Sequence, residues 1–225
     1  MIRLHVICEG QTEEMFVNEV LAAYLGRQMD LRASRVGKPG RKGGDVRFSR
    51  LLHDVRQRLL GDRSAYCTTF FDFYGLPPKF PGRSAARRKR NHWEKGACVV
   101  QAMTVELQNQ MGDEPMRRFI PYVQMYEFEG LLFSDPDGLS EGINARALAN
   151  RFREIREAFA TPEEINDDPR TAPSRRIQGL FPEYEKPLHG TLAAIEIGLG
   201  KIRQQCPLFD SWVRRLQSLI ERDSG

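Results

Sequence analysis

Leu4-His5-Val6-Ile7-Cys8-Glu9-Gly10-Gln11-Thr12-Glu13-Glu14 is the stretch that decides how this chain should fold. Its apolar first half predicts a buried strand over residues 2–8. The chain then turns after Glu9, and Thr12 is a candidate N-cap for a helix whose apolar positions continue to Leu25. A strand that ends on a carboxylate and leads into a helix is typical of the edge where open α/β sheets build their active sites.

The same alternation of strands and helices continues outward from this stretch. Further strands are expected over residues 31–36, 65–72 and 119–125. Helices are expected between them, over residues 45–60 with Asp45 as the cap, and over residues 93–110. This order predicts an α/β fold with a mostly parallel sheet covered by helices on both faces.

The pattern becomes mainly helical after residue 136, which suggests two parts. Residues 1–136 are predicted to form the α/β catalytic core, and residues 137–225 a helical C-terminal extension packed on it. Helices are expected in this extension over residues 145–159, 175–180, 191–205 and 208–221. In the last of these, Leu208, Trp212, Leu216 and Leu219 form an apolar stripe. Burial in the core is the preferred interpretation of the stripe, and a homodimer or partner-docking surface is the alternative.

Composition and charge exclude several classes of protein. The chain has 225 residues, of which 40% are apolar and 28% charged, as in ordinary globular proteins. No apolar run approaches the roughly 20 residues that span a bilayer, and the start lacks a signal peptide's layout, so we expect a cytoplasmic protein without a membrane partner. The four cysteines form no CxxC pair, which excludes zinc spacing and a disulfide framework. The net charge of +4 permits nucleic-acid binding.

Acidic side chains follow three of the predicted strands. Glu9 and Asp72 end the first and third strands, and Glu127 and Glu129 follow the last. Because parallel strands end at one edge of the sheet, these four candidate catalytic residues can converge there and hold Mg²⁺ or Mn²⁺. Glu9, Asp72 and Glu127 are the expected metal ligands. In an extended segment Glu127 and Glu129 would face the same side, whereas in a helix they would lie about 200° apart and only one could enter the site. Glu127 is favoured because it lies nearer the strand end. Glu13 and Glu14 are interpreted as favourable charges in the first turn of the helix.

Basic residues suggest a polyanionic substrate. The candidate nucleic-acid or phosphate contacts are Lys38, Arg41, Lys42, Arg83, Arg87, Arg88, Lys89, Arg175 and Lys186. A solvated charge run is the alternative for the segment over residues 83–90. Tyr74, Phe80 and Trp93 flank that segment and could stack on bases, with core packing as the alternative. His92 is the one histidine considered as an acid–base group. The chain has no GxxxxGK[ST] motif, so it carries no P-loop of its own.

Glu9-Gly10-Gln11-Thr12-Glu13, followed later by a strand that ends on Asp72, resembles the Toprim fold of topoisomerases, primases and overcoming-lysogenization-defect nucleases. The whole chain resembles a bacterial family known only as domain of unknown function number 4276, from residue 4 to about residue 212. The segments that carry this resemblance include Asp72-Phe73-Tyr74-Gly75-Leu76-Pro77, Arg118-Phe119-Ile120-Pro121-Tyr122, Tyr126-Glu127-Phe128-Glu129, Pro162-Glu163-Glu164-Ile165-Asn166 and Cys206-Pro207.

The resemblance implies a Toprim-like catalytic core, in which the first glutamate and a later Asp-x-Asp hold magnesium. Glu9 matches that glutamate and Asp72 the first aspartate, whereas Tyr74 stands where the second aspartate would be. We expect Glu127 or Glu129 to replace the missing ligand. Related Toprim proteins are often encoded with an ABC-type or AAA ATPase in phage-defence systems, which implies such an ATPase as a partner.

These observations lead to a magnesium-dependent nuclease of bacterial anti-phage defence, acting on RNA (tRNA included) or DNA. Glu9 could bind the metal or serve as general base, and the sequence does not separate these roles. One alternative is a non-catalytic Toprim-like module that binds an ATPase partner or nucleic acid. Another is a phosphotransferase or phosphatase that acts on a small nucleotide.

Overall fold

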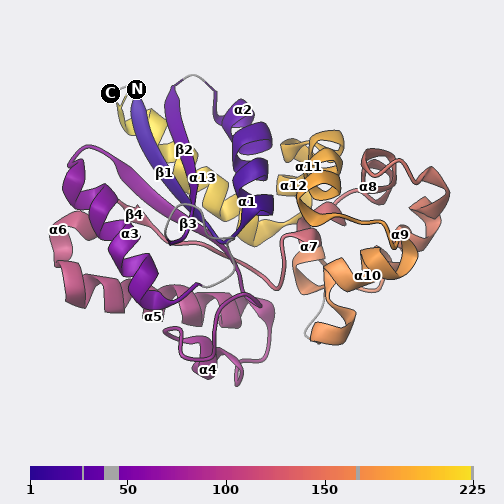
Figure 1. Ribbon diagram of the computed structural model, residues 1–225, viewed down its shortest axis with the longest axis horizontal. Coiled ribbons are helices and arrows are strands. Elements are labelled where there is room, and N and C mark those ends of the chain that lie inside the picture. Colours follow the sequence, from indigo (N-terminus) through magenta and orange to yellow (C-terminus); the bar gives the residue numbers. More distant parts are fainter. Residues whose placement is uncertain (27, 38–45, 166–167, 224–225) are drawn as a thin grey trace.

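The core of the protein is a five-stranded parallel sheet, which confirms the predicted α/β class (Figure 1). The computed structural model describes all residues except 27, 38–45, 166–167 and 224–225. The strands are β1 (Ile2–Cys8), β2 (Met29–Arg35), β3 (Tyr66–Asp72), β4 (Phe119–Ile120) and β5 (Val123–Gln124). They lie in the order β2-β1-β3-β4, and β5 pairs with the end of β3. All pairings are parallel, so the strands end at the same edge of the sheet.

Helices cover both faces of the sheet, as the alternation of elements predicted. One face packs against α1 (Gln11–Phe16), the π-helical turn η1 (Val17–Leu21), α2 (Ala22–Leu25) and α13 (Pro207–Asp223), and the other against α3 (Phe48–Gly61) and α5 (His92–Met111). The side chains of the strands alternate between the two layers: Val6 and Phe70 belong to the first core, Ile7 and Phe71 to the second.

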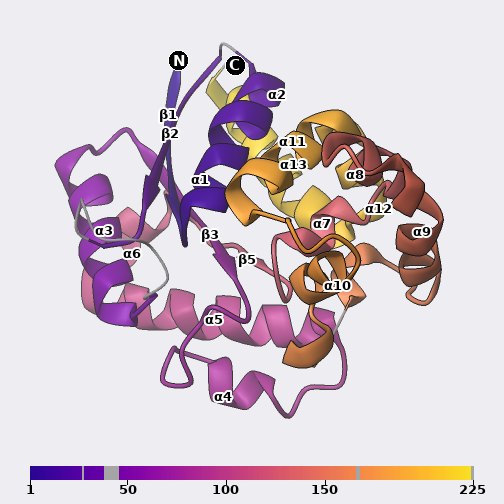
Figure 2. The same cartoon turned by 45° about the vertical axis from the view of Figure 1, so that its right-hand side comes forward.

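The remaining helices are short and mostly belong to the C-terminal part. They are α4 (Arg83–Ala86), α6 (Asp113–Met116), α7 (Glu129–Leu132), α8 (Pro136–Gly142), α9 (Ala149–Glu157), α10 (Pro173–Leu180), α11 (Lys186–Ile197) and α12 (Leu199–Gln205), with 3-10 turns η2 (Arg146–Leu148), η3 (Pro162–Glu164) and η4 (Pro169–Thr171). Helix α11 packs between α1 and α8 (Figure 2).

One hydrophobic core joins the sheet to the C-terminal helices. The ring of Phe16 in α1 lies 5.2 Å from that of Phe128 and 6.0 Å from that of Phe209 in α13. Trp212, Leu216 and Leu219 are buried in the same core, which confirms the burial expected for these members of the apolar stripe of α13, whereas Leu208 is only partly buried. The division of the chain at residue 136 stays a prediction. Within the described ranges, none of the helices combines the length and apolar character that crossing a membrane requires.

Several predicted boundaries were wrong, each for a local reason. Gly10, not Thr12, is the N-cap of the first helix, and Thr12 lies buried inside its first turn. The predicted strand 119–125 is split into β4 and β5 because Pro121 has no N–H for the ladder. There, the Thr69 hydroxyl accepts from the Tyr122 amide and donates to the Tyr122 carbonyl.

The helical segments predicted near the C-terminus also divide. The expected helix over residues 145–159 consists of η2 followed by α9. The helix expected over residues 191–205 begins earlier, at Lys186, and is interrupted at Gly198. The φ of +75° at Gly198 lies in a region that ends helices and favours glycine. Asp45, the predicted cap of the second helix, lies outside the described residues.

Candidate active site

The ends of β1 and β3 place Glu9 and Asp72 side by side, as the parallel pattern predicted. The backbone amide of Asp72 donates to Glu9 Oε2 at 3.1 Å. Gly75 lies in the loop after β3, against the carboxylate of Glu9. A Cβ added to Gly75 would overlap both oxygens and the carboxyl carbon of Glu9. A glycine at this position is therefore what lets the loop pass the carboxylate so closely.

A sharp turn after β5 positions Glu127 and Glu129. Tyr126 has a φ of +58°, which is unusual for a bulky residue and reverses the chain between β5 and α7. The Tyr126 carbonyl accepts from the Tyr74 amide at 3.1 Å, and the two rings lie 5.3 Å apart. This contact joins the loop that follows Asp72 to the loop that carries the two glutamates.

Lys186, the first residue of α11, is the cation of this site. Its Nζ donates to Glu129 Oε2 at 3.2 Å and lies 3.6 Å from Glu127 Oε1. Both glutamates therefore point to one cation. Glu129, which begins α7, is the more buried of the two. Burial alone would lower the pKa of Lys186, but Glu129, Glu127 and Asp72 raise it above its usual value.

The site holds far more negative than positive charge. Burial raises the pKa of Glu9 to about 8, and the neighbouring Glu13 and Glu127 carboxylates add to this increase. Burial also raises the pKa of Glu129 to about 7 and that of Asp72 well above its usual range. We define the acidic cluster as Glu9, Glu13, Asp72, Glu127 and Glu129. Among the described residues, Lys186 is the one cation that acts on several of its members, so the cluster favours an added proton or an added cation.

Two carboxylate oxygens of the acidic cluster have no hydrogen-bond partner among the described residues. They are Asp72 Oδ1 and Glu129 Oε1, and both are buried. Such oxygens are the hard ligands that Mg²⁺ and Mn²⁺ prefer, so the donor set fits the implied metal. In the part of the chain that the structure describes, no three acidic, histidine or cysteine side chains are already arranged to hold a metal ion. Magnesium commonly takes only one or two protein carboxylates, with water and substrate phosphates completing its shell.

Two residues of the site were not predicted from the sequence. Glu13, which was interpreted as a helix-terminal charge, is 5% exposed, and its Oε2 accepts from the Gly10 amide at 2.8 Å. A glutamate in the third helical position reaching back to the cap is the pattern that could have revealed this. The buried hydroxyl of Tyr184 also lacks a partner within the described residues. Burial raises its pKa, with added contributions from Glu129 and Glu127.

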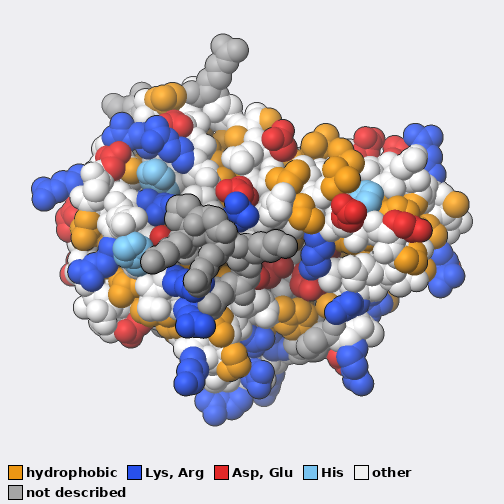
Figure 3. All heavy atoms as spheres, viewed as in Figure 1, with side chains coloured by type: hydrophobic (Ala, Val, Ile, Leu, Met, Phe, Trp, Pro, Cys, Tyr) orange, Lys and Arg blue, Asp and Glu red, His pale blue; other side chains and the backbone are white. Residues whose placement is uncertain are grey.

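The predicted phosphate contacts have different surroundings. Arg87, Arg88 and Lys89 are exposed beside α4, where basic side chains gather along one margin of the surface (Figure 3). The guanidinium of Arg83 lies 4.0 Å above the ring of Phe73, one residue after Asp72. Arg175 is exposed on α10, directly after Ser174, whose amide donates to Glu127 Oε2 at 2.9 Å. Lys186 pairs with the acidic cluster, and Lys38, Arg41 and Lys42 lie outside the described residues.

His92 and the aromatic candidates have other surroundings. His92 is buried at the start of α5, with Nδ1 3.7 Å from Glu164 Oε1, and burial lowers its pKa. Phe80 is buried in the core, which supports the packing interpretation for that residue, whereas Trp93 is 44% exposed.

These features define an α/β protein with a buried acidic site at the carboxyl edge of a parallel sheet. The chain belongs to the family described as Domain of unknown function (DUF4276), whose model matches residues 8–217. Glu9, Asp72, Glu127, Glu129 and Lys186 all lie within the matched range. Neither the search of curated proteins nor that of solved structures finds a match.

Proposed function

We propose that this protein is a Toprim-like, magnesium-dependent nuclease that cuts RNA (possible substrates include tRNA) or DNA as the effector of a bacterial anti-phage system, together with an ATPase partner. The acidic cluster is the observation that supports this proposal most. Carboxylates from three strand ends share one buried site, in which Lys186 is the lysine that the described residues supply. Two of the carboxylate oxygens lack a hydrogen-bond partner among the same residues. Burying such charges is costly unless a cation or a proton compensates them.

Each residue of the cluster then has a role in phosphodiester hydrolysis. Glu9, Asp72 and Glu127 would hold Mg²⁺ or Mn²⁺, which when bound supplies a Lewis acid that stabilises negative charge on the phosphate. The pKa of about 8 makes Glu9 a possible proton acceptor near neutral pH, so its role as ligand or base stays open. Lys186 would neutralise charge beside Glu129. Arg175 and the basic residues beside α4 would bind the backbone of the nucleic acid.

A cleavage assay tests the proposal. Labelled tRNA, single-stranded DNA and duplex DNA are incubated with Mg²⁺ or Mn²⁺, with and without any ATPase that is encoded next to this protein. Wild type, Glu9→Ala and the control Glu157→Ala, which changes an exposed glutamate of α9, are compared. We expect cleavage that requires the metal and Glu9 but not Glu157, with circular dichroism showing that all three proteins are folded. A folded Glu9→Ala protein that cuts as well as wild type would contradict the proposal.

A non-catalytic module that binds an ATPase partner or nucleic acid is the second candidate. Two observations favour it: Tyr74 replaces the second aspartate of the Toprim pattern, and the described residues contain no preformed set of three ligands. Calorimetry separates the two candidates. Uptake of Mg²⁺ or Mn²⁺ that Glu9→Ala removes supports the nuclease, and no uptake, even with nucleic acid present, supports the binding module.

A further inference from the structure

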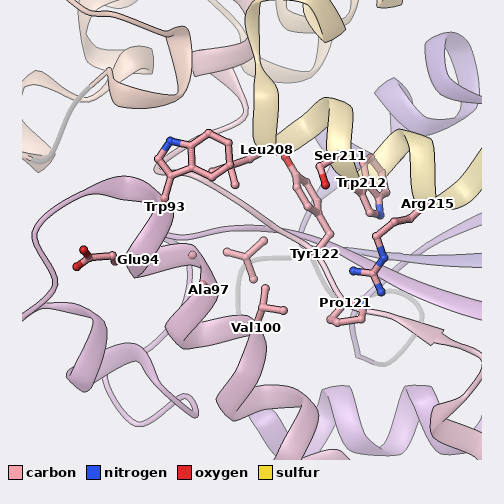
Figure 4. Close-up of a pocket in the computed structure, with 12 residues that line it drawn as sticks. Trp93, Glu94, Ala97, Val100, Pro121, Tyr122, Leu208, Ser211, Trp212 and Arg215 are labelled. Carbon is pink, nitrogen blue, oxygen red and sulfur yellow. The ribbon is translucent and has the colours of Figure 1, made fainter.

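A cavity separate from the acidic cluster opens at the β4–β5 edge of the sheet, between α5 and α13 (Figure 4). Its volume is about 410 Å³, and its walls are mainly apolar. The residues that line it include Trp93, Ala97, Val100, Tyr122, Leu208 and Trp212. The rings of Tyr122 and Trp212 stack 4.5 Å apart and are almost fully buried, so they form a rigid wall. Trp93, 44% exposed, forms an accessible aromatic side.

A shallow, open hollow of about 460 Å³, lined mostly by residues with polar or charged side chains, adjoins this cavity along α13. The two spaces share Ser211 and Arg215, and Arg214 and Ser218 also line the hollow. These four residues lie three, four and seven positions apart, so they occupy one face of the helix. Hydroxyl and guanidinium donors arranged in this way suit the oxygens of a phosphate group.

The charges around the hollow favour an anion. The Asp210 carboxylate accepts hydrogen bonds from both Arg203 and Arg214 at 2.6 Å, so one negative charge is shared by two positive charges. Arg215 forms no ion pair with any described residue, and burial of part of its side chain lowers its pKa. Glu94, the acid beside the cavity, points away from it (Figure 4) and instead accepts from the Arg90 amide at 3.1 Å. Asp210 and Arg214 both line the hollow and pair with each other, so Arg215 is the lining cation that has no ion pair among the described residues.

We propose that the cavity and the hollow together bind a nucleotide, with the base against Trp93 in the apolar part and the phosphate on Arg215 and the Ser211 hydroxyl. Both volumes lie in the range of small-molecule sites. An apolar peptide would leave the cationic end unused, and inorganic phosphate would leave the aromatic end unused. The nucleotide can be free or can be the terminal unit of a nucleic acid. This site shares no lining residue with the acidic cluster, so it does not depend on the proposed nuclease activity.

Calorimetric titration with adenosine, guanosine, cytidine and uridine 5′-monophosphates tests the site, with adenosine and inorganic phosphate as partial ligands. We expect at least one monophosphate to bind with a dissociation constant at or below about 1 mM, and adenosine and phosphate to bind at least about tenfold more weakly. Arg215→Gln should weaken monophosphate binding about tenfold and leave adenosine binding unchanged. Trp93→Ala should weaken both about tenfold, because it removes a stacking surface. Arg151→Gln, an exposed arginine of α9, is the control and should bind as wild type does.

The outcomes separate the two sources of the ligand. A 5′-phosphorylated oligonucleotide that binds far more tightly than the monophosphate, with the same loss in Arg215→Gln, identifies the end of a nucleic acid. Equal affinities identify a free nucleotide. If none of the four monophosphates and no oligonucleotide binds, or if folded Arg215→Gln and Trp93→Ala proteins bind as wild type does, the proposal is overturned.

Discussion

Two regions of this protein bury carboxylates in opposite ways. Glu163, in η3, is fully buried, and both of its oxygens accept backbone amides at the start of α13: Leu208 N and Phe209 N, each at 2.9 Å. In the acidic cluster, Asp72 and Glu129 are also buried, but each has one oxygen without a partner among the described residues. Glu163 is surrounded by donors, whereas Asp72 is surrounded by other acids.

We interpret this difference as that between a structural carboxylate, Glu163, and the candidate functional carboxylates of the acidic cluster. The two bonds to Glu163 satisfy amides that the first turn of α13 cannot pair internally, so this residue stabilises the fold. In the acidic cluster, backbone amides pair single oxygens of Glu9, Glu13 and Glu127. Its members nevertheless repel one another, and Lys186 is the cation among the described residues that opposes this repulsion. Groups that cost stability in this way are typical of sites kept for binding or chemistry.

The largest expected effect comes from Asp72→Asn. This change keeps the shape of the side chain but removes a ligand charge from the acidic cluster. We expect metal-dependent cleavage to fall by about 10³-fold or more, since each charged ligand stabilises the transition state by several kcal/mol. The metal-free protein should melt at the same temperature or higher, because repulsion among buried acids is reduced. Single-turnover cleavage and thermal melts measure the two quantities. A large loss of stability would place Asp72 with Glu163 as a structural group.

The stability of the metal-free protein should decrease as the pH rises. Glu9 and Glu129 have folded-state pKa values of about 8 and about 7, above the ordinary value of 4.5, so the folded state binds more protons than the unfolded state between these values. The free energy of unfolding therefore falls across this window, by on the order of 5 kcal/mol between about pH 5 and about pH 8. Urea unfolding at a series of pH values measures this. Lys186 does not reverse the sign, because it stays charged throughout.

The same urea unfolding series can be repeated with added Mg²⁺. A metal that binds the ionised cluster should stabilise the protein more at about pH 8 than at about pH 5, because protonation competes with binding. Glu9→Gln should reduce both the pH dependence and the response to Mg²⁺, whereas Glu163→Gln should leave the response to Mg²⁺ intact. A pH dependence that Glu9→Gln does not change would show that other groups cause it.

The convergence of Glu9 and Asp72 could be predicted because it depends only on local patterns. An apolar strand followed by an acid fixes the position of that acid, and parallel pairing brings the strand ends to one edge. The pair formed by Glu129 and Lys186 could not be predicted, since it requires α11 to pack against α7, far away in the sequence. The role of Glu163 was also missed, because its partners are backbone amides more than forty residues later.

The ambiguity between Glu127 and Glu129 had a different physical origin. The prediction assumed that residues 127–129 form either a regular strand or a regular helix. The left-handed φ of Tyr126 and the start of α7 instead place them in a turn that is neither. In this turn both carboxylates reach Lys186. A periodicity argument applies only within a regular element, so it could not decide between the two residues.

Gly75→Ala tests how closely Glu9 must be held. The added methyl group would overlap the Glu9 carboxylate and push it away from its position beside Asp72. We expect cleavage to fall by about 10- to 100-fold, because a displacement of the order of 1 Å is enough for such a loss. Gly179→Ala is the control, since nothing lies within 4 Å of the corresponding Cβ. Equal cleavage by both variants would show that the position of Glu9 is not critical.

The smallest effect is expected from Glu163→Gln, which changes the structural carboxylate of the comparison. Glu163→Gln keeps one acceptor oxygen for the start of α13 but turns an amide NH₂ toward the second backbone N–H. We expect the free energy of unfolding to decrease by about 1–2 kcal/mol, which corresponds to a melting temperature lower by roughly 2–8 °C. Cleavage per folded molecule should stay unchanged, since Glu163 contacts α13 and not the acidic cluster. Burial raises the pKa of Glu163 from 4.5 to about 7, so wild type loses stability as the pH rises through this value, whereas Glu163→Gln does not titrate there. The loss caused by the substitution should therefore be larger at about pH 6 than at about pH 8. Melts of both proteins at about pH 6 and about pH 8 measure this, and a loss of cleavage without a loss of stability would reverse the assignment of Glu163 as structural.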